Sequence, residues 1–261
     1  MSLSAVLFDV DGTLADTERD GHRLAFNSAF KDFGLNWNWD IELYGKLLQI
    51  TGGKERIRYY INHYSPEISK NTNLTDWISE LHKTKTVYFL KLLSEGKIPL
   101  RPGVARLIHE LRKNNIRMAI VTTTTPENVY ALLESTLGEK SPNWFDVIGA
   151  GDVVPYKKPA PDIYYWVLDK LQLTPDKCIA IEDSENGLKA SLAANINTII
   201  TTSEYTHSQN FNGAAMVLTN LGEPEEPATI LTNSYTLEPK TTLINVSSLE
   251  QSLCVNIKSN F

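Results

Sequence analysis

The sequence predicts an α/β protein with a doubly wound parallel sheet and an inserted, all-helical cap. Short runs rich in β-branched residues recur along the chain and are apolar throughout, which is typical of parallel strands covered on both faces. Helix-period segments separate these runs, and such alternation favours a doubly wound core. The six apolar runs are residues 5–8, 117–122, 145–150, 178–182, 197–201 and 215–219.

The segments between the runs support this prediction, because their apolar residues recur at the helical period. In residues 104–114 one stripe forms from Val104, Leu107, Ile108 and Leu111. In residues 162–173 another stripe forms from Ile163, Trp166, Val167 and Leu171.

The chain departs from the alternation in residues 16–96, which contain helical stripes and no strand pattern. A helical block of this length is too long for a crossover between strands, so we predict a cap domain there. The core domain is then expected to comprise residues 1–15 and 97–225. Residues 226–261 form an extension to which the sequence assigns no role.

Composition excludes several function classes. The chain has 261 residues and a formal net charge of −6, which argues against nucleic-acid binding because nucleic acids favour a basic face. No run of about 18 apolar residues predicts a membrane span. Cys178 and Cys254 are too few for a disulfide framework. We therefore expect a monomer in the cytoplasm, or in the plastid stroma if a presequence has been removed.

Polar side chains follow four of the expected strands where each strand ends. Ligands of an open parallel sheet bind beyond the carboxyl ends of its strands, so these side chains mark the expected site. They are Asp9 and Asp11, Thr122, Lys157 and Lys158, and Glu182 and Asp183.

The four carboxylates of this set predict a metal site, because clustered carboxylates repel one another unless a cation joins them. Mg²⁺ fits, since it binds carboxylate and phosphate oxygens together. A lysine and a hydroxyl beside the ion would hold a phosphate through charge and hydrogen bonds. A single strand-end aspartate is often only a turn former, but the whole set favours a metal and phosphate site.

Four motifs in this order resemble those of the haloacid dehalogenase superfamily of phosphotransferases. They are DVDGT (9–13), VTT (121–123), KKPAPD (157–162) and EDSENG (182–187). The helical block between the first and second motifs is similar to the helical cap of that superfamily. The resemblance covers roughly residues 4–225, and four motifs at four strand ends are far more specific than one.

The resemblance implies catalytic roles. Asp9 would be the nucleophile that takes the phosphoryl group as an aspartyl phosphate. Asp11 would first protonate the leaving oxygen and then activate water. Thr122 and Lys158 would hold the phosphoryl group, and Lys158 is preferred to Lys157 because the lysine of the family directly precedes the proline.

The resemblance also implies how Mg²⁺ would be held. Its ligands would be the Asp9 carboxylate, the main-chain carbonyl of Asp11 and the Asp183 carboxylate. Glu182 would contact the ion directly or through water, and it could instead lie outside the ligand set.

The stretch TGGKERIR (51–58) is a candidate for substrate recognition in the helical insertion. Glycine at Gly53 lets the backbone approach a ligand, at a helix start that favours an anion. Lys54 or Arg56 could reach a second phosphate. The alternative is a solvated helix start whose positive charges balance Glu55.

Four further polar residues are candidate substrate contacts near the cleft. Glu18 and His22 follow the first motif closely, and His22 is either a surface residue or a partner for a sugar hydroxyl. Tyr44 either lines the cleft or packs in the core. Thr123 is either a helix-entry residue or a substrate contact.

Within the superfamily, the stretches DTERDGHRLAFN, LYGKLLQITGGKERI and VLTNLGEPEEP resemble the CbbY group, which dephosphorylates xylulose 1,5-bisphosphate. The resemblance implies a Mg²⁺-dependent sugar-bisphosphate phosphatase, with xylulose 1,5-bisphosphate as the first expected substrate. Two alternatives stay open: a mutase like β-phosphoglucomutase, and a non-catalytic phosphosugar-binding protein. The intact pair Asp9 and Asp11 argues against the second.

Overall fold

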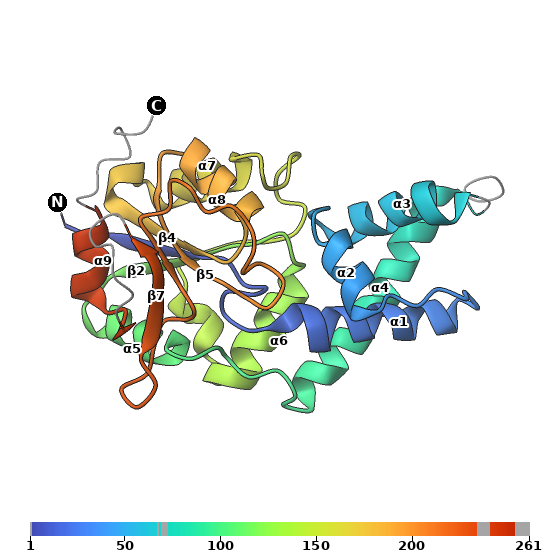
Figure 1. The fold of residues 1–261 in the computed structure, drawn as a ribbon, viewed down its shortest axis with the longest axis horizontal. Coiled ribbons are helices and arrows are strands. Elements are labelled where there is room, and N and C mark those ends of the chain that lie inside the picture. Colours follow the sequence, from blue (N-terminus) through green and yellow to red (C-terminus); the bar gives the residue numbers. More distant parts are fainter. Residues whose placement is uncertain (1, 67, 69–72, 234–240, 254–261) are drawn as a thin grey trace.

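The structure is a computed structural model that describes residues 2–66, 68, 73–233 and 241–253 (Figure 1). In these residues the strands form one eight-stranded sheet in the order β3-β2-β1-β4-β5-β6-β7-β8. β1 to β6 run parallel, whereas β7 and β8 are antiparallel to their neighbours. The strands are β1 (Ala5–Phe8), β2 (Arg117–Val121), β3 (Val147–Gly149), β4 (Cys178–Glu182), β5 (Asn197–Thr201), β6 (Met216–Leu218), β7 (Ala228–Asn233) and β8 (Thr241–Thr242).

Helices cover both faces of this sheet, which confirms the predicted doubly wound α/β core (Figure 1). Because successive side chains of a strand point to opposite faces, Val6 and Phe8 pack with α5, α6 and α9, whereas Ala5 and Leu7 pack with α7 and α8. The core helices are α5 (Val104–Lys113), α6 (Pro126–Leu137), α7 (Asp162–Leu171), α8 (Glu185–Ala193) and α9 (Val246–Leu253), with short 3₁₀ turns at η3 (Ser141–Trp144) and η4 (Pro175–Lys177).

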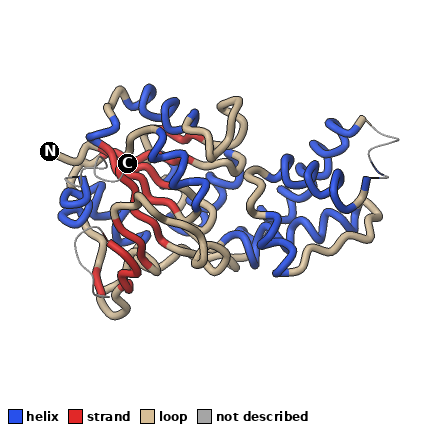
Figure 2. The backbone as a smooth tube through the Cα atoms, turned by 45° about the horizontal axis from the view of Figure 1, so that its top comes forward, coloured by secondary structure: helices blue, strands red, loops and turns tan. Residues whose placement is uncertain are grey.

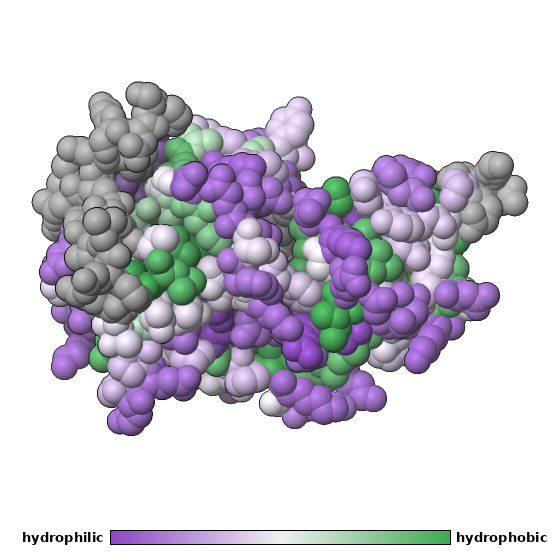
Figure 3. All heavy atoms as spheres, in the orientation of Figure 1, coloured by the Kyte–Doolittle hydropathy of each residue, from purple (hydrophilic) through white to green (hydrophobic). Residues whose placement is uncertain are grey.

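A lobe made of helices follows β1 and projects from one end of the sheet (Figure 2). Its own buried cluster includes Phe26, Phe30 and Trp39, and hydrophilic residues cover most of its surface in the view of Figure 3. No strand occurs among the described residues of 16–96. The helical lobe consists of the π-helix η1 (Glu18–His22), α1 (Arg23–Asp32), α2 (Ile41–Leu47), α3 (Gly53–Tyr64) and α4 (Leu74–Ser94).

Two chain connections join the helical lobe to the sheet, and they run side by side. Ala15 forms an antiparallel bridge with Leu100. The main-chain N–H of Arg101 donates to the Leu14 carbonyl at 2.8 Å. The lobe is therefore attached next to the turn that follows β1.

The residues after 225 add to the core sheet. β7 pairs with β6, and α9 places Leu249 in the apolar cluster beneath the sheet. Residues 234–240 and 254–261, which include Cys254, lie outside the described part of the chain. In the part that is described, no helix has both the length and the apolar character needed to cross a membrane.

Leu249→Ala is expected to lower the free energy of unfolding by about 2–5 kcal/mol, because the change leaves a cavity where a side chain is now fully buried. Urea unfolding followed by circular dichroism measures the effect. Leu231→Ala, on the exposed side of β7, is the control and should change the same quantity by less than about 0.5 kcal/mol. Equal stability of the two variants would contradict the role of α9 in the core.

Candidate active site

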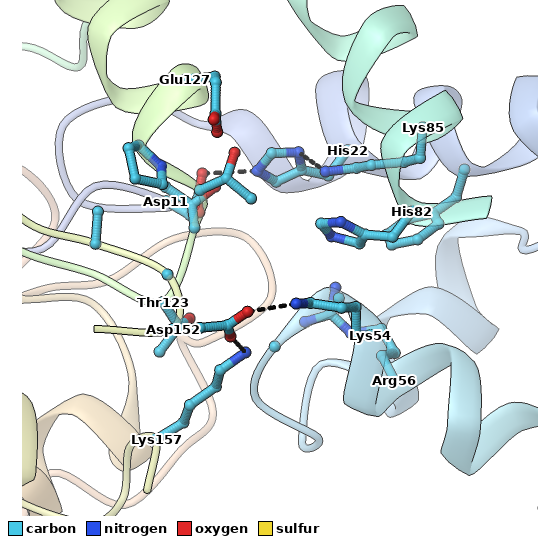
Figure 4. Close-up of a pocket in the computed structure, with 18 of the residues that line it drawn as sticks. Asp11, His22, Lys54, Arg56, His82, Lys85, Thr123, Glu127, Asp152 and Lys157 are labelled. Atoms are coloured by element: carbon cyan, nitrogen blue, oxygen red, sulfur yellow. Dashed lines mark hydrogen bonds and ion pairs between the residues drawn. The ribbon is translucent and has the colours of Figure 1, made fainter. Parts of the chain in front are cut away.

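Two adjoining cavities lie between the sheet and the helical lobe, at the carboxyl ends of the parallel strands. The carboxylate cavity has a volume of 340 Å³ and contains Asp9, Lys158 and Asp183. The basic cavity has a volume of 370 Å³ and contains Lys54, His82 and Lys85 (Figure 4). Both cavities are bordered by Asp11, Glu18, Gly52, Arg56 and Thr123.

Three buried carboxylates meet in and beside the carboxylate cavity. Asp9, Glu182 and Asp183 each bring one oxygen to within 4.8 Å of the others. The Lys158 ammonium donates to Asp9 Oδ1 at 2.8 Å, to Glu182 Oε1 at 2.6 Å and to the Val121 carbonyl at 2.7 Å. Lys158 therefore joins two of the three carboxylates and ties them to the end of β2.

The charges of this cluster are only partly balanced. Burial raises the pKa of Asp9 to about 7, with Lys158 opposing the rise and Glu182 adding to it. Burial and the negative charges of Asp9 and Glu182 raise the pKa of Asp183 well above its usual value. Since a buried carboxylate is costly without a partner, the cluster is suited to hold a further cation.

The details of the cluster fit Mg²⁺. Glu182 Oε2 is buried and has no hydrogen-bond partner among the described residues, although Glu182 Oε1 accepts from Lys158 and Tyr164. Gly12 has φ +82°, and a Cβ there would collide with the Asp183 carboxylate. The turn after β1 thus brings the backbone close to carboxylate oxygens, and oxygen donors of this kind are those that Mg²⁺ prefers.

Asp11 lies apart from the cluster and borders both cavities. Its Oδ1 accepts from Thr17 Oγ1 at 2.5 Å and lies 2.8 Å from His22 Nε2. His22 Nδ1 in turn lies 2.7 Å from the buried Lys85 ammonium (Figure 4). Burial alone would raise the pKa of Asp11, but His22 and the two hydrogen bonds outweigh it and lower the pKa to about 2.

The threonines at the end of β2 face the same space. Thr122 is buried and lines the carboxylate cavity, and its hydroxyl accepts from the Thr124 N–H at 3.2 Å. Thr123 borders both cavities. The structure therefore brings the expected Thr122 and Thr123 to the site, next to the carboxylates.

Glu18, Tyr44 and Arg56 form a linked group at the floor of the helical lobe. Tyr44 donates to Glu18 Oε2 at 2.5 Å, and Arg56 Nη1 donates to the Tyr44 oxygen at 3.0 Å. Glu18 and Arg56 border both cavities. Tyr44 lines neither cavity, in contrast to the expectation that it contacts substrate, because its ring is fully buried in the lobe's aromatic cluster.

Ion pairs between the lobe and the core close one side of the basic cavity (Figure 4). Lys54 pairs with Asp152 from the loop after β3. Lys157 lies 3.0 Å from Asp152 Oδ1 and 2.9 Å from Glu55 Oε1. Gly53 leaves room for His82, since a Cβ at this glycine would collide with the imidazole.

Several residues that surround the site were missed by sequence reasoning. Tyr164 donates to Glu182 Oε1 at 2.5 Å, and Ser203 donates to Asp183 Oδ2 at 3.0 Å. Nothing in the sequence near either residue marks this role. Lys85 had a signal, because it stands between Leu81 and Phe89 on the buried stripe of α4, where a lysine needs a reason.

Known proteins with similar sequences and structures show the family to which this site belongs. The haloacid dehalogenase-like hydrolase family matches residues 3–195. The CbbY protein of Cupriavidus necator is 45% identical over 225 residues, which cover 86% of this chain and 88% of that protein. A crystal structure of an aspartate-to-asparagine variant of CbbY from Rhodobacter sphaeroides, in complex with xylulose-(1,5)bisphosphate, is 44% identical with a TM-score of 0.78, and the match covers 84% of this chain and 94% of that chain. The phosphorylated carbohydrates phosphatase of Thermotoga maritima is 31% identical over 232 residues, which cover 88% of this chain and 98% of that protein.

The chain therefore belongs to the haloacid dehalogenase-like hydrolases, and it is an enzyme. Within that family it is similar to the CbbY proteins over most of its length. This finding confirms the resemblance that the four motifs indicated.

His82 makes folding sensitive to acid. Burial, together with the positive charges of Lys85, Lys54, His22 and Lys157, lowers its pKa to about 3. Below pH 6.5 the His82 imidazole binds a proton in the unfolded chain, whereas in the folded protein it stays neutral down to about pH 3. Stability therefore falls as the pH falls through this range.

We expect the free energy of unfolding to fall by about 1 kcal/mol more in the wild type than in His82→Gln between pH 7.5 and pH 5.5, because only the wild type carries this proton linkage. Urea titrations at the two pH values measure the difference. His109→Gln, which removes an exposed histidine of α5, is the control and should keep the wild-type dependence. A His82→Gln variant with that same dependence would contradict the burial of a neutral imidazole.

Proposed function

We propose that this enzyme is a Mg²⁺-dependent phosphatase that hydrolyses a small sugar bisphosphate, most simply xylulose 1,5-bisphosphate, through an aspartyl phosphate. The observation that carries the proposal is the pairing of the carboxylate cavity with the basic cavity at Asp11. One end of this space suits a metal and the phosphoryl group that reacts, and the other suits a second anion. The ligand in the crystal structure of Rhodobacter sphaeroides CbbY is a bisphosphate, with one phosphate for each end of such a space.

The proposed roles of the carboxylate cavity follow from its contacts. Mg²⁺ would be held by the carboxylates of Asp9 and Asp183 and the main-chain carbonyl of Asp11, with Glu182 bound directly or through water. When bound, the ion neutralises charge on the cluster and on the phosphate. Lys158, which already contacts Asp9, would hold a phosphoryl oxygen as the phosphate enters.

The hydrolysis would proceed in two steps, with Thr122 providing a hydrogen bond to the phosphoryl group. An Asp9 carboxylate oxygen attacks phosphorus, the bond from phosphorus to the sugar oxygen breaks, and Asp11 gives its proton to that oxygen. Asp11 then takes a proton from water as the water oxygen attacks phosphorus, which frees phosphate and restores Asp9.

Asp11 must carry a proton when the first step begins, although its pKa is about 2 without substrate. A bound bisphosphate places negative charge beside it, and negative charge raises the pKa of a carboxyl group. Thr17 and His22 hold the carboxyl in a fixed direction. A bound bisphosphate would thus raise the pKa of Asp11 so that it can act as the acid, whereas water in an empty site would not.

The basic cavity is the proposed place for the sugar and its second phosphate. Lys54, Arg56 and Lys85 supply positive charge there, and Glu18 would contact a hydroxyl group. A hydroxyl that binds His22 would have to replace Asp11 or Lys85 at one of its two ring nitrogens. Lys54 is already paired with Asp152, so a phosphate that attracts Lys54 must compete with this carboxylate. Thr123, which borders both cavities, would contact the substrate, and Gly53 would let the ligand approach the backbone at the start of α3.

In this proposal the helical lobe is the cap domain, covering residues 16–96, on a core of residues 1–15 and 97–225. The ion pairs of Lys54 and Lys157 hold the cap against the core. A closed cap would exclude bulk water from the aspartyl phosphate. The β7–α9 segment then completes the core from within residues 226–261.

The test is phosphate release with Mg²⁺ from xylulose 1,5-bisphosphate, ribulose 1,5-bisphosphate, β-glucose 1-phosphate and simple monophosphates. We expect selective release from the xylulose compound, and a loss of at least about 1,000-fold in kcat for Asp9→Asn, because the nucleophile is removed. Asp20→Asn, at an exposed carboxylate of η1, is the matched control and should keep full activity.

Two outcomes would replace this proposal. Glucose 6-phosphate formed from β-glucose 1-phosphate without free phosphate would identify a mutase. Mg²⁺ binding with no turnover of any phosphate ester would identify a phosphosugar-binding protein.

A further inference from the structure

Arg101 is buried where the second connection from the helical lobe enters the core, with 8% of its surface exposed. Its Nη1 donates to the carbonyls of Gly12 and Thr201, and its Nη2 donates to those of Thr202 at 2.6 Å and Thr219 at 2.8 Å. Burying a guanidinium is costly unless its donors are satisfied. Here both terminal nitrogens are satisfied by main-chain carbonyls from three separate segments.

These carbonyls belong to segments that carry the site. Gly12 directly follows Asp11, and a Cβ at Gly12 would meet the Asp183 carboxylate. Thr202 directly precedes Ser203, which donates to Asp183 Oδ2 at 3.0 Å. One side chain therefore ties the turn after β1 to the ends of β5 and β6, and two of these segments meet at the same oxygen of Asp183, Oδ2.

The same side chain also joins the two connections of the helical lobe. Arg101 lies in the second connection, and its main-chain N–H donates to the Leu14 carbonyl of the first at 2.8 Å. Its Nε lies 3.3 Å from Asp16 Oδ1, one residue beyond the bridge between Ala15 and Leu100. The guanidinium thus meets both connections where they leave the core.

Lysine could not make this set of contacts. An ammonium offers three donors from one point, whereas the planar guanidinium spreads its donors in a fork that reaches carbonyls on separate segments. The fork is needed here because the carbonyls of Gly12, Thr202 and Thr219 belong to three segments that are far apart in the sequence.

We propose that Arg101 is a positioning residue that holds the turn of Asp11 and Gly12 against the strand ends around Asp183, and so sets the shape of the metal site. The inference rests on the proposed function for the identity of the metal. It assigns to Arg101 no contact with substrate or metal. Its effect is transmitted through the Gly12 carbonyl and through the segment that carries Ser203.

The chain offers a matched control in Arg106 on α5. Arg106 Nη2 donates to the carbonyls of Leu221 at 3.0 Å, Gly222 at 2.8 Å and Ile244 at 2.9 Å. It is thus another arginine anchored on main-chain carbonyls. In contrast to the partners Gly12 and Thr202 of Arg101, none of its partners borders either cavity or directly neighbours a residue that does. A purely structural effect of losing such an anchor should appear equally in both variants.

The experiment compares Arg101→Lys with Arg106→Lys. Calorimetric titration with Mg²⁺ alone gives the Kd, urea unfolding gives stability, and steady-state kinetics gives kcat and KM. Both variants are expected to lose stability. Arg101→Lys should raise the Kd for Mg²⁺ at least about tenfold and lower kcat, and Arg106→Lys should leave the Kd within about twofold of the wild type.

Arg101→Lys with the Kd and kcat of Arg106→Lys would overturn the proposal and leave Arg101 a structural anchor. If Arg101→Lys does not fold, Asp16→Asn is the second test of the proposal. This change removes the ion pair at Nε and keeps the arginine itself, with its hydrogen bonds to the main-chain carbonyls. A Kd for Mg²⁺ raised two- to fivefold supports the proposal, and an unchanged Kd overturns it. A wild type that binds Mg²⁺ but hydrolyses no phosphate ester would overturn the proposed function alone.

Discussion

The burial of Asp9, Glu182 and Asp183 at adjacent strand ends is the constraint on which this structure depends. Lys158 balances part of their charge, and burial still raises the pKa of Asp9 and Asp183. Such a cluster is stable only if the fold holds its members together against repulsion. The sheet does so because β1 lies between β2 and β4, which brings the motifs of three strands to one point.

The helical lobe places positively charged side chains next to this negative cluster. The basic cavity adjoins the carboxylate cavity, and Asp11 stands between them with Thr17 and His22 as partners. A molecule with a phosphate at each end would meet a metal and Lys158 at one end and basic side chains at the other. The proposal of a sugar bisphosphate as substrate therefore rests on the distribution of charge more than on the fold.

Most of the core and the central carboxylates could be predicted from the sequence, because both depend on local pattern. Asp9 and Glu182 stand at the ends of apolar runs, and parallel strands bring such ends together. Arg101 and Ser203 could not be predicted in this way, since their partners lie far away in the sequence. Tyr44 shows the converse case, because a tyrosine on a helical stripe can pack in the core through its ring and reach the site only through hydrogen bonds to other side chains, here Glu18 and Arg56.

Strand β7 was not predicted from the sequence, for a different reason. β7 is an antiparallel strand between β6 and the short edge strand β8, and one of its faces is exposed, so its apolar pattern is weaker than that of the central strands. The stretch rich in proline and glutamate before it resembles a linker. The structure shows that β7 belongs to the core sheet, because it pairs with β6.

Calorimetric titration of the wild type and Asp183→Asn with Mg²⁺, without substrate, measures whether the buried carboxylates hold the metal. We expect one Mg²⁺ site in the wild type and its loss in the variant, because an amide keeps the shape of the carboxylate but not its charge. Equal binding by both proteins would contradict the proposed metal site, since the buried carboxylates would then not be what holds the metal.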